Sequence, residues 1–441
     1  MIVLFRLLTT LLLLLTFAPA FAQKADEMAV LLMKKGDALA LRRLLVVNRD
    51  SLNKRTLALA EAYVRGCQGD AHRAAKDMRR AMKKQNGEID SALEERLTFG
   101  IALQQHRAGK NRKAAKTLAN YMRTRGTFAM LSTFQQYEQL FRAYHSQHID
   151  RVSPGDARIP FRLDSVGGNG VRSVAMRIPA EVNGVNADFM LDTGATLNVV
   201  SQAMADSLGL ERLGLPVFLD GMGKNRGQMA LAKSISLGGR TLKNALFCVM
   251  DGQQTDASAT ENMAHLNAIF GLPLLMLFTD VQIDFRNQTI LATVNADNDN
   301  LQRNGESEQT FLERGNLSIG FSENGLLLEV FHHGRPLSLI PDTGATHSVL
   351  NTADAPEQRD YITSNFPHRE VEFVGWGGRQ RGREYLYPQY DVTVGQTVVS
   401  LPEMSVFDAP VYDSRLGMDF FTRCERVSFH LRYPFQLTVI R

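Results

Sequence analysis

The sequence predicts a multidomain protein in which N-terminal, all-α helical-hairpin repeats precede an all-β region made of two lobes. The chain has 441 residues, which is long for a single hydrophobic core. Residues 23–150 show apolar residues at helical spacing and contain no proline. Beyond residue 158, short alternating runs separated by glycine-bearing turns are typical of strands and hairpins. We therefore expect a helical domain over 23–150, lobes over 158–295 and 311–441, and a polar interlobe linker over 296–310.

The helical domain shows an internal repeat. The segment "TLALAEAYVRGCQGDAHRAAKDMRRAMKK" predicts one helix to about Arg65, a turn through Gly66 and Gly69, and a second helix from Asp70. The pattern returns about forty positions later, where the Ala-Ala-Lys at 74–76 recurs at 114–116. Paired helices at such a period resemble tetratricopeptide-type repeats. This similarity is loose and covers two or three hairpins.

Residues 1–22 have the layout of a cleaved secretory signal. Arg6 precedes an apolar run from Leu7 to Phe17, and small residues follow at Ala20 and Ala22. The run is short for a membrane span, so an uncleaved anchor is the less favoured alternative. We expect a periplasmic or secreted protein with no membrane span after signal cleavage.

The net charge of +4 hides an asymmetry between the two regions. Residues 24–150 carry 24 Lys and Arg against 13 Asp and Glu, whereas residues 151–441 carry 25 against 33. The two regions either attract each other or recruit different partners. We interpret the basic residues as a solvated helix face, with a nucleic-acid or anionic-partner surface as the alternative. On the favoured interpretation we expect no nucleic acid as a partner. A protein partner bound through the helical domain is a further expectation.

The three cysteines, Cys67, Cys248 and Cys424, are too few for a disulfide framework. At most one pair can form, which leaves an odd thiol. We favour small buried hydrophobic residues over a thiol nucleophile.

The β-rich region contains one motif twice. "FMLDTGATLNVVS" spans 189–201 and "LIPDTGATHSVLN" spans 339–351, so the two aspartates stand 150 positions apart. Each copy follows a hairpin and an apolar strand. Each then precedes a Gly-rich turn, a second hydrophobic-Gly element ("AIFGLPLL" or "SRLGMDFF") and a final strand pair. Two copies of one small β module are the simplest account of this order.

These motifs resemble the aspartic protease family, and the Asp-Thr-Gly-Ala form is most similar to its retropepsin-like branch. The resemblance covers residues 158–441 and implies the bilobal aspartic protease fold. It also implies aspartic-type endopeptidase activity, with one aspartate donated by each lobe to a cleft that binds an extended peptide. The expected catalytic residues are Asp192 and Asp342.

A carboxylate pair suits this chemistry. Two close carboxylates cannot both ionise cheaply, so they share a proton and their titrations separate. One then acts as general base on a water and the other as general acid, and the near-symmetric motifs leave open which of them starts protonated.

The neighbours of the two aspartates are expected to support the site. Gly194 and Gly344 let a backbone N–H approach a carboxylate without a side chain in the way. The resemblance implies that Thr193 and Thr343 hydrogen-bond across the axis and hold the two loops together. It also places the small residues Ala195 and Ala345 below the aspartates.

The Gly-rich turns are candidate flaps that close over substrate. The flap residues are Gly221, Met222 and Gly223 in the first lobe, and Gly375, Trp376 and Gly377 in the second. Trp376, the only Trp, is interpreted as a flap-tip contact to substrate, with ordinary half-burial as the alternative. The first lobe has no Tyr in its turn, so a pepsin-like Tyr flap is not supported.

Three positions depart from the family pattern. Pro341 directly precedes Asp342 and lacks an N–H for the strand ladder. Arg415 takes the first position of the second hydrophobic-hydrophobic-Gly element, where it points either to solvent or to a carboxylate. Pro273 replaces the acidic residue that often follows the first such element, whereas Asp419 keeps it in the second.

We expect no cofactor and no metal site. His332, His333 and His347 have no Cys or carboxylate spacing that would complete a metal site. Two alternatives to a single-chain peptidase stay open. One is an inactive peptide-binding scaffold with the same fold, and the other is a homodimer whose sites each use two copies of one aspartate.

Overall fold

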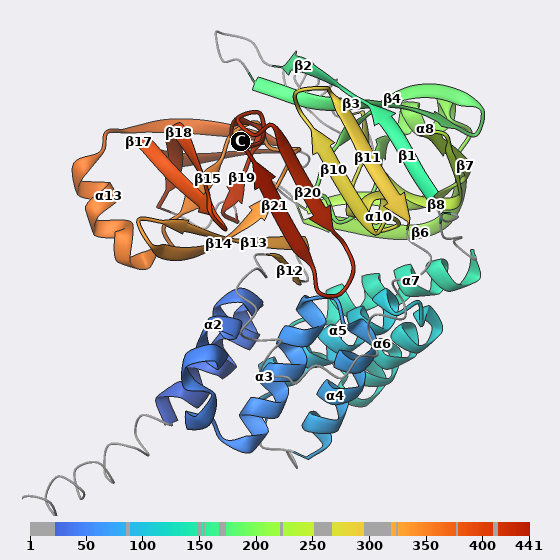
Figure 1. Ribbon diagram of the computed structural model, residues 1–441. Helices are drawn as coiled ribbons and strands as arrows, with labels where there is room; N and C mark the ends of the chain where they lie inside the picture. Colours follow the sequence, from blue (N-terminus) through green and yellow to red (C-terminus); the bar gives the residue numbers. More distant parts are fainter. Residues whose placement is uncertain are drawn as a thin grey trace, which may run out of the picture. The chain divides into compact units, whose positions relative to one another are not determined.

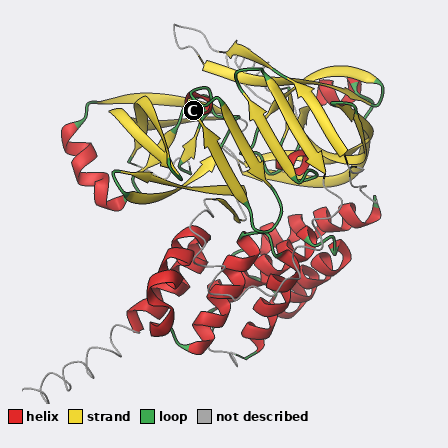
Figure 2. Ribbon diagram, in the orientation of Figure 1, coloured by secondary structure: helices red, strands yellow, loops and turns green. Residues whose placement is uncertain are grey.

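The computed structural model describes residues 23–84, 89–147, 152, 155–166, 173–220, 224–250, 267–294, 319–322, 325–375, 378–408 and 413–441. The chain separates into two compact units. Helices make up the first unit, which contains the residues through Phe141, and strands dominate the second (Figures 1 and 2). Each unit is described by itself.

The helical unit is a series of antiparallel helices. Residues 23–35 are helical. The elements that follow are α2 (Ala38–Asn48), η1 (Arg49–Ser51), α3 (Lys54–Cys67), α4 (Ala71–Lys83), α5 (Ser91–Arg107), α6 (Asn111–Arg125) and α7 (Leu131–Ser146). Consecutive helices from α2 through α6 pack against one another, as helical hairpins require. The predicted hairpin is confirmed, with α3 ending at Cys67, two residues beyond the expected Arg65.

Side-chain caps set where these helices begin. The Asp70 carboxylate accepts a hydrogen bond from the Arg73 N–H at the start of α4, and Asp90 accepts from the Leu93 N–H at the start of α5. A capping carboxylate satisfies an N–H that has no partner inside the helix. The seam between α5, α6 and α7 is filled by a cluster of aromatic and small residues that includes Phe99, Leu118 and Phe134.

The β-rich unit contains two sheets that follow the same strand order. Lobe 1 has β2 (Arg162–Val166), β3 (Ser173–Val182), β4 (Val185–Leu191), β5 (Val199–Ser201), α8 (Gln202–Ser207), β6 (Glu211–Asp220), β7 (Lys224–Leu237), β8 (Arg240–Met250), β9 (Ala268–Phe270) and α10 (Leu272–Leu275). Lobe 2 has β12 (Ile319–Ser322), β13 (Gly325–His332), β14 (Arg335–Pro341), β15 (Val349–Asn351), η3 (Pro356–Gln358), α13 (Arg359–Asn365), β16 (His368–Gly375), β17 (Gly378–Val394), β18 (Thr397–Phe407), β19 (Arg415–Leu416) and α14 (Met418–Phe421).

The strand order is β2-β3-β4-β9-β5-β8-β7-β6 in lobe 1 and β12-β13-β14-β19-β15-β18-β17-β16 in lobe 2. The two orders match strand for strand. An additional pairing also matches, β3 with β7 in lobe 1 and β13 with β17 in lobe 2. The duplicated module that the repeated motif predicts is therefore a duplicated topology.

A third sheet joins the two lobes. Its order is β1-β11-β10-β20-β21, from β1 (Gly155–Pro160), β10 (Asp280–Asp284), β11 (Thr289–Val294), β20 (Arg426–His430) and β21 (Gln436–Ile440). The final strand pair of each lobe thus enters one sheet, where β10 pairs with β20 in antiparallel register (Figure 1). We call it the joining sheet. Backbone hydrogen bonds across it make the lobes parts of one unit.

Some predicted segments lie outside the described residues, namely the signal segment 1–22 and the linker 296–310. No helix in the described ranges has both the length and the apolar character needed to cross a bilayer.

Candidate active site

The two motif aspartates lie at matched places in the two lobes. Asp192 follows β4, and its N–H donates to the Phe270 carbonyl at 2.9 Å. Asp342 follows β14, and its N–H donates to the Leu416 carbonyl at 2.9 Å. In each lobe the strand before the aspartate runs parallel to the short strand of the hydrophobic-Gly element. The repeated sequence elements therefore meet behind each aspartate.

Each carboxylate is held by the backbone of its own loop. Asp192 Oδ1 accepts the Gly194 and Ala195 N–H groups at 2.8 and 2.9 Å. Asp342 Oδ1 accepts the corresponding N–H groups of Gly344 and Ala345 at 2.9 and 3.0 Å. Two amide donors favour the charged form of a carboxylate and fix its orientation. The alanines thus contribute backbone donors as well as small side chains.

The two carboxyl groups meet across the lobes. A Cβ placed on Gly194 would lie 2.5 Å from the Asp342 Cγ, and one placed on Gly344 would collide with the Asp192 carboxyl group in the same way. Only glycine allows this approach. Burial, followed by the charge of Asp342, raises the pKa of Asp192 well above its ordinary value.

The two threonines link the loops reciprocally. The Thr193 hydroxyl donates to the Pro341 carbonyl at 2.5 Å and accepts the Thr343 N–H at 2.9 Å. The Thr343 hydroxyl donates to the Leu191 carbonyl at 2.7 Å and accepts the Thr193 N–H at 3.1 Å. Both threonines are buried. Pro341 fits this arrangement because the contact made there uses its carbonyl, and Pro341 is the last residue of β14.

A second set of contacts differs between the lobes. In lobe 1 the Asn198 side chain accepts the Gly271 N–H at 3.0 Å and donates to the Leu246 carbonyl. In lobe 2 the Ser348 hydroxyl accepts the Gly417 N–H at 3.0 Å and donates to Asp419 at 2.7 Å. The Asn198 side chain thus joins the Gly271 N–H to a backbone carbonyl by itself. In lobe 2 the Ser348 hydroxyl joins the Gly417 N–H to the carboxylate of Asp419. This explains why lobe 1 tolerates Pro273 in place of the acidic residue.

Arg415 points to a carboxylate rather than to solvent alone. Its Nη1 donates to Asp342 Oδ2 at 2.8 Å, and its Nε donates to the Asp413 carbonyl at 3.2 Å. The sequence left both orientations open, and the structure selects the ion pair.

A model of the aspartyl protease family matches residues 178–261 and 328–420, which places one match in each lobe. The β-rich region is thus similar to the aspartyl protease family in both of its lobes. Among solved structures, the chain is similar to a retropepsin-like aspartic protease from Rickettsia conorii. The two are 22% identical, the match covers 33% of this chain and 96% of that one, and the TM-score is 0.23. No match to a curated protein was found.

The flap residues of the aspartic protease region are only partly described. Gly221, Met222, Gly223, Trp376 and Gly377 lie outside the described residues. Gly375 ends β16, where its backbone pairs with Gly378 at the start of β17. The Trp376 prediction therefore stays a prediction.

The other candidate groups lie apart from the aspartates. Cys67, Cys248 and Cys424 are buried free thiols, and burial raises the pKa of both Cys67 and Cys424 to about 12. His332 is buried, stacks on Tyr390, and contacts the Asp391 carbonyl through Nδ1. No cluster of His, Cys, Asp and Glu suited to a metal ion occurs in the described part of the chain.

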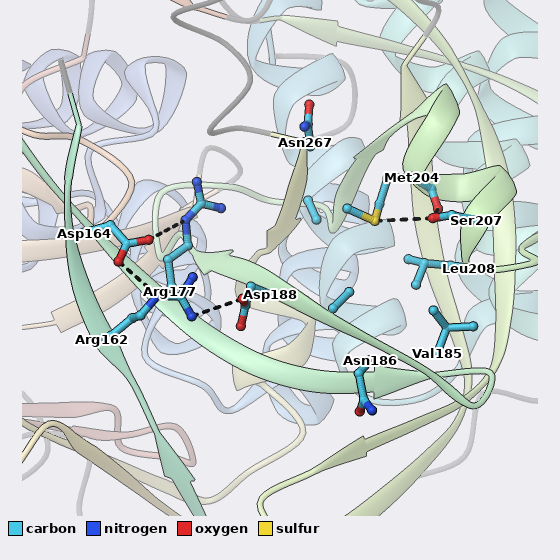
Figure 3. Close-up of a pocket in the computed structure, with 12 residues that line it drawn as sticks. Arg162, Asp164, Arg177, Val185, Asn186, Asp188, Met204, Ser207, Leu208 and Asn267 are labelled. Carbon is cyan, nitrogen blue, oxygen red and sulfur yellow. Dashed lines mark hydrogen bonds and ion pairs between the residues drawn. The ribbon is translucent and has the colours of Figure 1, made fainter. Parts of the chain in front are cut away.

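A pocket of about 460 Å³ lies in lobe 1 (Figure 3). Arg162 pairs there with Asp164 and Asp188, both at 3.0 Å, and Arg177 approaches Asp164 at 3.8 Å. None of the described lining residues belongs to the predicted site. Because its two arginines face two aspartates, the pocket carries no excess charge that would select a ligand, and we assign it no function.

Proposed function

We propose that the β-rich region is an aspartic-type endopeptidase that hydrolyses peptide bonds with a water activated by Asp192 and Asp342. The observation that carries the proposal is the meeting of the two carboxyl groups, one from each lobe, across two glycines that leave no room for a side chain. The reciprocal threonine contacts support it, because they fix the separation of the loops on which a shared proton depends.

In the proposed mechanism one carboxyl group acts first as base and then as acid, while the other polarises the scissile carbonyl. In the singly protonated pair, the carboxylate takes a proton from the water as it attacks the scissile carbonyl, and the carboxylic acid donates a hydrogen bond to the carbonyl oxygen. Collapse of the tetrahedral intermediate returns a proton to the leaving amine. The raised pKa of Asp192 supports the pairing, since burial and the neighbouring carboxyl group favour retention of its proton.

The test is cleavage of an unbiased peptide library by the purified mature chain, with Asp192→Asn and Asp342→Asn as matched controls. We expect cleavage by the native chain and a loss of about 10²–10⁴-fold in each variant. Peptide binding without cleavage by all three proteins would instead favour the inactive scaffold.

The substrate and setting are also proposals. We propose an extended peptide or protein segment as the substrate, since strand-like pairing is the usual way to hold such a chain at a sheet-rich cleft. We further propose a periplasmic or secreted location after cleavage following Ala22, which N-terminal sequencing of the exported protein would test. We propose that the tetratricopeptide-like helical unit recruits a protein partner or substrate. Binding of purified candidate proteins to the full chain would test that role.

A further inference from the structure

The two aspartates are held alike by their own loops but differ in their third partner. Each Oδ1 accepts two backbone N–H groups at 2.8–3.0 Å, so these donors give neither carboxylate an advantage. Asp342 additionally receives the Arg415 guanidinium at 2.8 Å on Oδ2. A guanidinium keeps its charge throughout the range in which enzymes work, so this contact favours a negative charge on its partner.

Arg415 reaches Asp342 because of its place in the lobe 2 sheet. β19 lies between β14 and β15, and Arg415 pairs with Ile340 on one side and Val349 on the other. The position related by the duplication is Ile269, which pairs with Met190 and Val199 in lobe 1 and is buried. One lobe thus has an apolar side chain where the other has a cation.

The Arg415–Asp342 ion pair includes one member of the Asp192–Asp342 pair, which we call the dyad. The Asp342 side chain is 5% exposed and that of Arg415 is 25% exposed, so the contact is partly shielded from water. Partial shielding strengthens the interaction relative to a surface ion pair, whereas the remaining exposure of Arg415 limits it.

We propose that Arg415 is a positioning residue that keeps Asp342 as the ionised member of the dyad, so that the shared proton resides on Asp192. The proposal rests on the proposed peptidase function and adds an assignment of the two roles. Asp342 is then the general base toward water, and Asp192 is the acid that polarises the scissile carbonyl.

The same contact sets the pH range of the dyad. The charged groups that act on Asp192 include Asp342 and Arg415, and Arg415 is the one that favours ionisation. Around β19, the titratable side chains in the described part of the chain include Asp354, Asp413, Asp419 and His347. Asp354 and Asp419 accept hydrogen bonds from Ser414 and Ser348, and His347 is exposed. Removal of the guanidinium makes each ionisation of the pair harder, so both limbs of the pH profile move to higher pH.

The experiment compares the pH dependence of kcat/KM for the native chain and Arg415→Gln, Arg415→Ile and Arg415→Lys. Gln removes the charge but keeps a donor, Ile installs the lobe 1 residue, and Lys keeps the charge. An opposite charge within a few ångströms moves a carboxyl titration by about 1–3 pH units, and the exposure of Arg415 places the expected displacement of the pH profile at about one pH unit. We expect both limbs to rise by that amount in the Gln and Ile variants and to stay near the native values in the Lys variant.

The matched control is Arg359→Gln, which removes an exposed lobe 2 arginine paired with Asp408. It changes the net charge equally and should leave the profile unmoved. A purely structural role for Arg415 predicts lower activity at every pH with no displacement of either limb, and that result would overturn the proposal.

A second readout does not depend on catalysis. Side-chain carboxyl ¹³C signals in aspartate-labelled protein, assigned with the two Asp→Asn variants, report which residue carries the proton in the singly protonated state. We expect the acid signal on Asp192 in the native chain and a more even distribution in Arg415→Gln. An acid signal on Asp342, or identical spectra, contradicts the assignment. If the native chain cleaves no peptide, the peptidase proposal fails while this measurement still decides the role of Arg415.

Discussion

At the scale of single residues, the dyad combines groups that stabilise and destabilise the fold. Burial and the neighbouring Asp342 carboxylate raise the pKa of Asp192. The folded chain therefore binds a proton at Asp192 more tightly than the unfolded chain does. The stability that this protonation contributes is complete below the ordinary pKa of 3.8 and is lost as the pH rises through the folded value. At neutral pH, where the unfolded chain has released this proton, the buried Asp192 carboxyl group therefore opposes folding.

The two Asp→Asn variants should consequently differ in stability. Asp192→Asn keeps an acceptor for the Gly194 N–H and removes the buried ionisable group, so we expect a higher Tm at pH 7 than for the native chain. Asp342→Asn leaves Arg415 beside a neutral group and should lower the Tm. Thermal unfolding at pH 7 and pH 3.5 checks this, and the advantage of Asp192→Asn should vanish at the lower pH. Equal shifts in both variants would contradict the asymmetry.

The threonine contacts give a second residue-scale prediction. Thr193→Val preserves the shape of the side chain but leaves the Pro341 carbonyl and the Thr343 N–H without the hydroxyl. Each buried group that loses its partner costs about 1–3 kcal/mol. We expect denaturant unfolding, followed by circular dichroism, to show a loss of unfolding free energy in that range or above, with Thr193→Ser close to native. A neutral Val variant would show that the loops are held by other contacts.

At the scale of elements, the site depends on short strands that pass behind the aspartate loops. A Cβ on Gly417 would lie 2.5 Å from the His347 carbonyl carbon and 2.9 Å from the Ala345 carbonyl oxygen. These are backbone atoms of the loop that carries Asp342, so they cannot move aside without displacing the aspartate. The glycine is therefore a packing requirement of the element.

Gly417→Ala should unfold the β-rich region more readily and reduce cleavage. A suitable control is Gly100→Ala in α5, where the nearest atom to an added Cβ is the Met78 sulfur at 4.0 Å. That change should be neutral or stabilise the helical unit by up to about 1 kcal/mol, since alanine favours a helix over glycine. Circular dichroism at 222 nm for the control and hydrogen exchange in the described lobe 2 strands for Gly417→Ala separate the two effects. Similar outcomes for both would mean that the close approach at Gly417 is not limiting.

The elements also show what sequence reasoning could and could not predict. The repeated Asp-Thr-Gly-Ala-Thr predicted a duplicated module because the spacing of strand, loop and hydrophobic-Gly element is local information. The direction of Arg415 was left open, since it depends on which strands flank β19 and on the burial of Asp342. Asn198 was not singled out at all. Its contact with Gly271 joins residues 73 positions apart, and the only available signal was Pro273, which removes the acidic partner that Ser348 has in lobe 2.

At the scale of the whole molecule, the duplication places both halves of the site in one chain. The joining sheet takes its strands from both lobes, and β10 and β20 pair along Asp280–Asp284 and Arg426–His430. Backbone pairing of this length fixes the lobes in one unit. A site formed between two copies of the chain would instead require each lobe to pair with the same lobe of the second copy.

One chain should therefore be sufficient for cleavage. We expect the rate to rise linearly with enzyme concentration, without the upward curvature that dimerisation produces at low concentration. Asp192→Asn and Asp342→Asn should each abolish most activity, and an equimolar mixture of the two variants should recover none of it, because neither chain holds a complete dyad. In the homodimer alternative, each single variant would keep an intact pair made from two copies of its remaining aspartate. Substantial activity in either variant alone, together with a second-order dependence on protein concentration, would therefore favour the homodimer over the single-chain site.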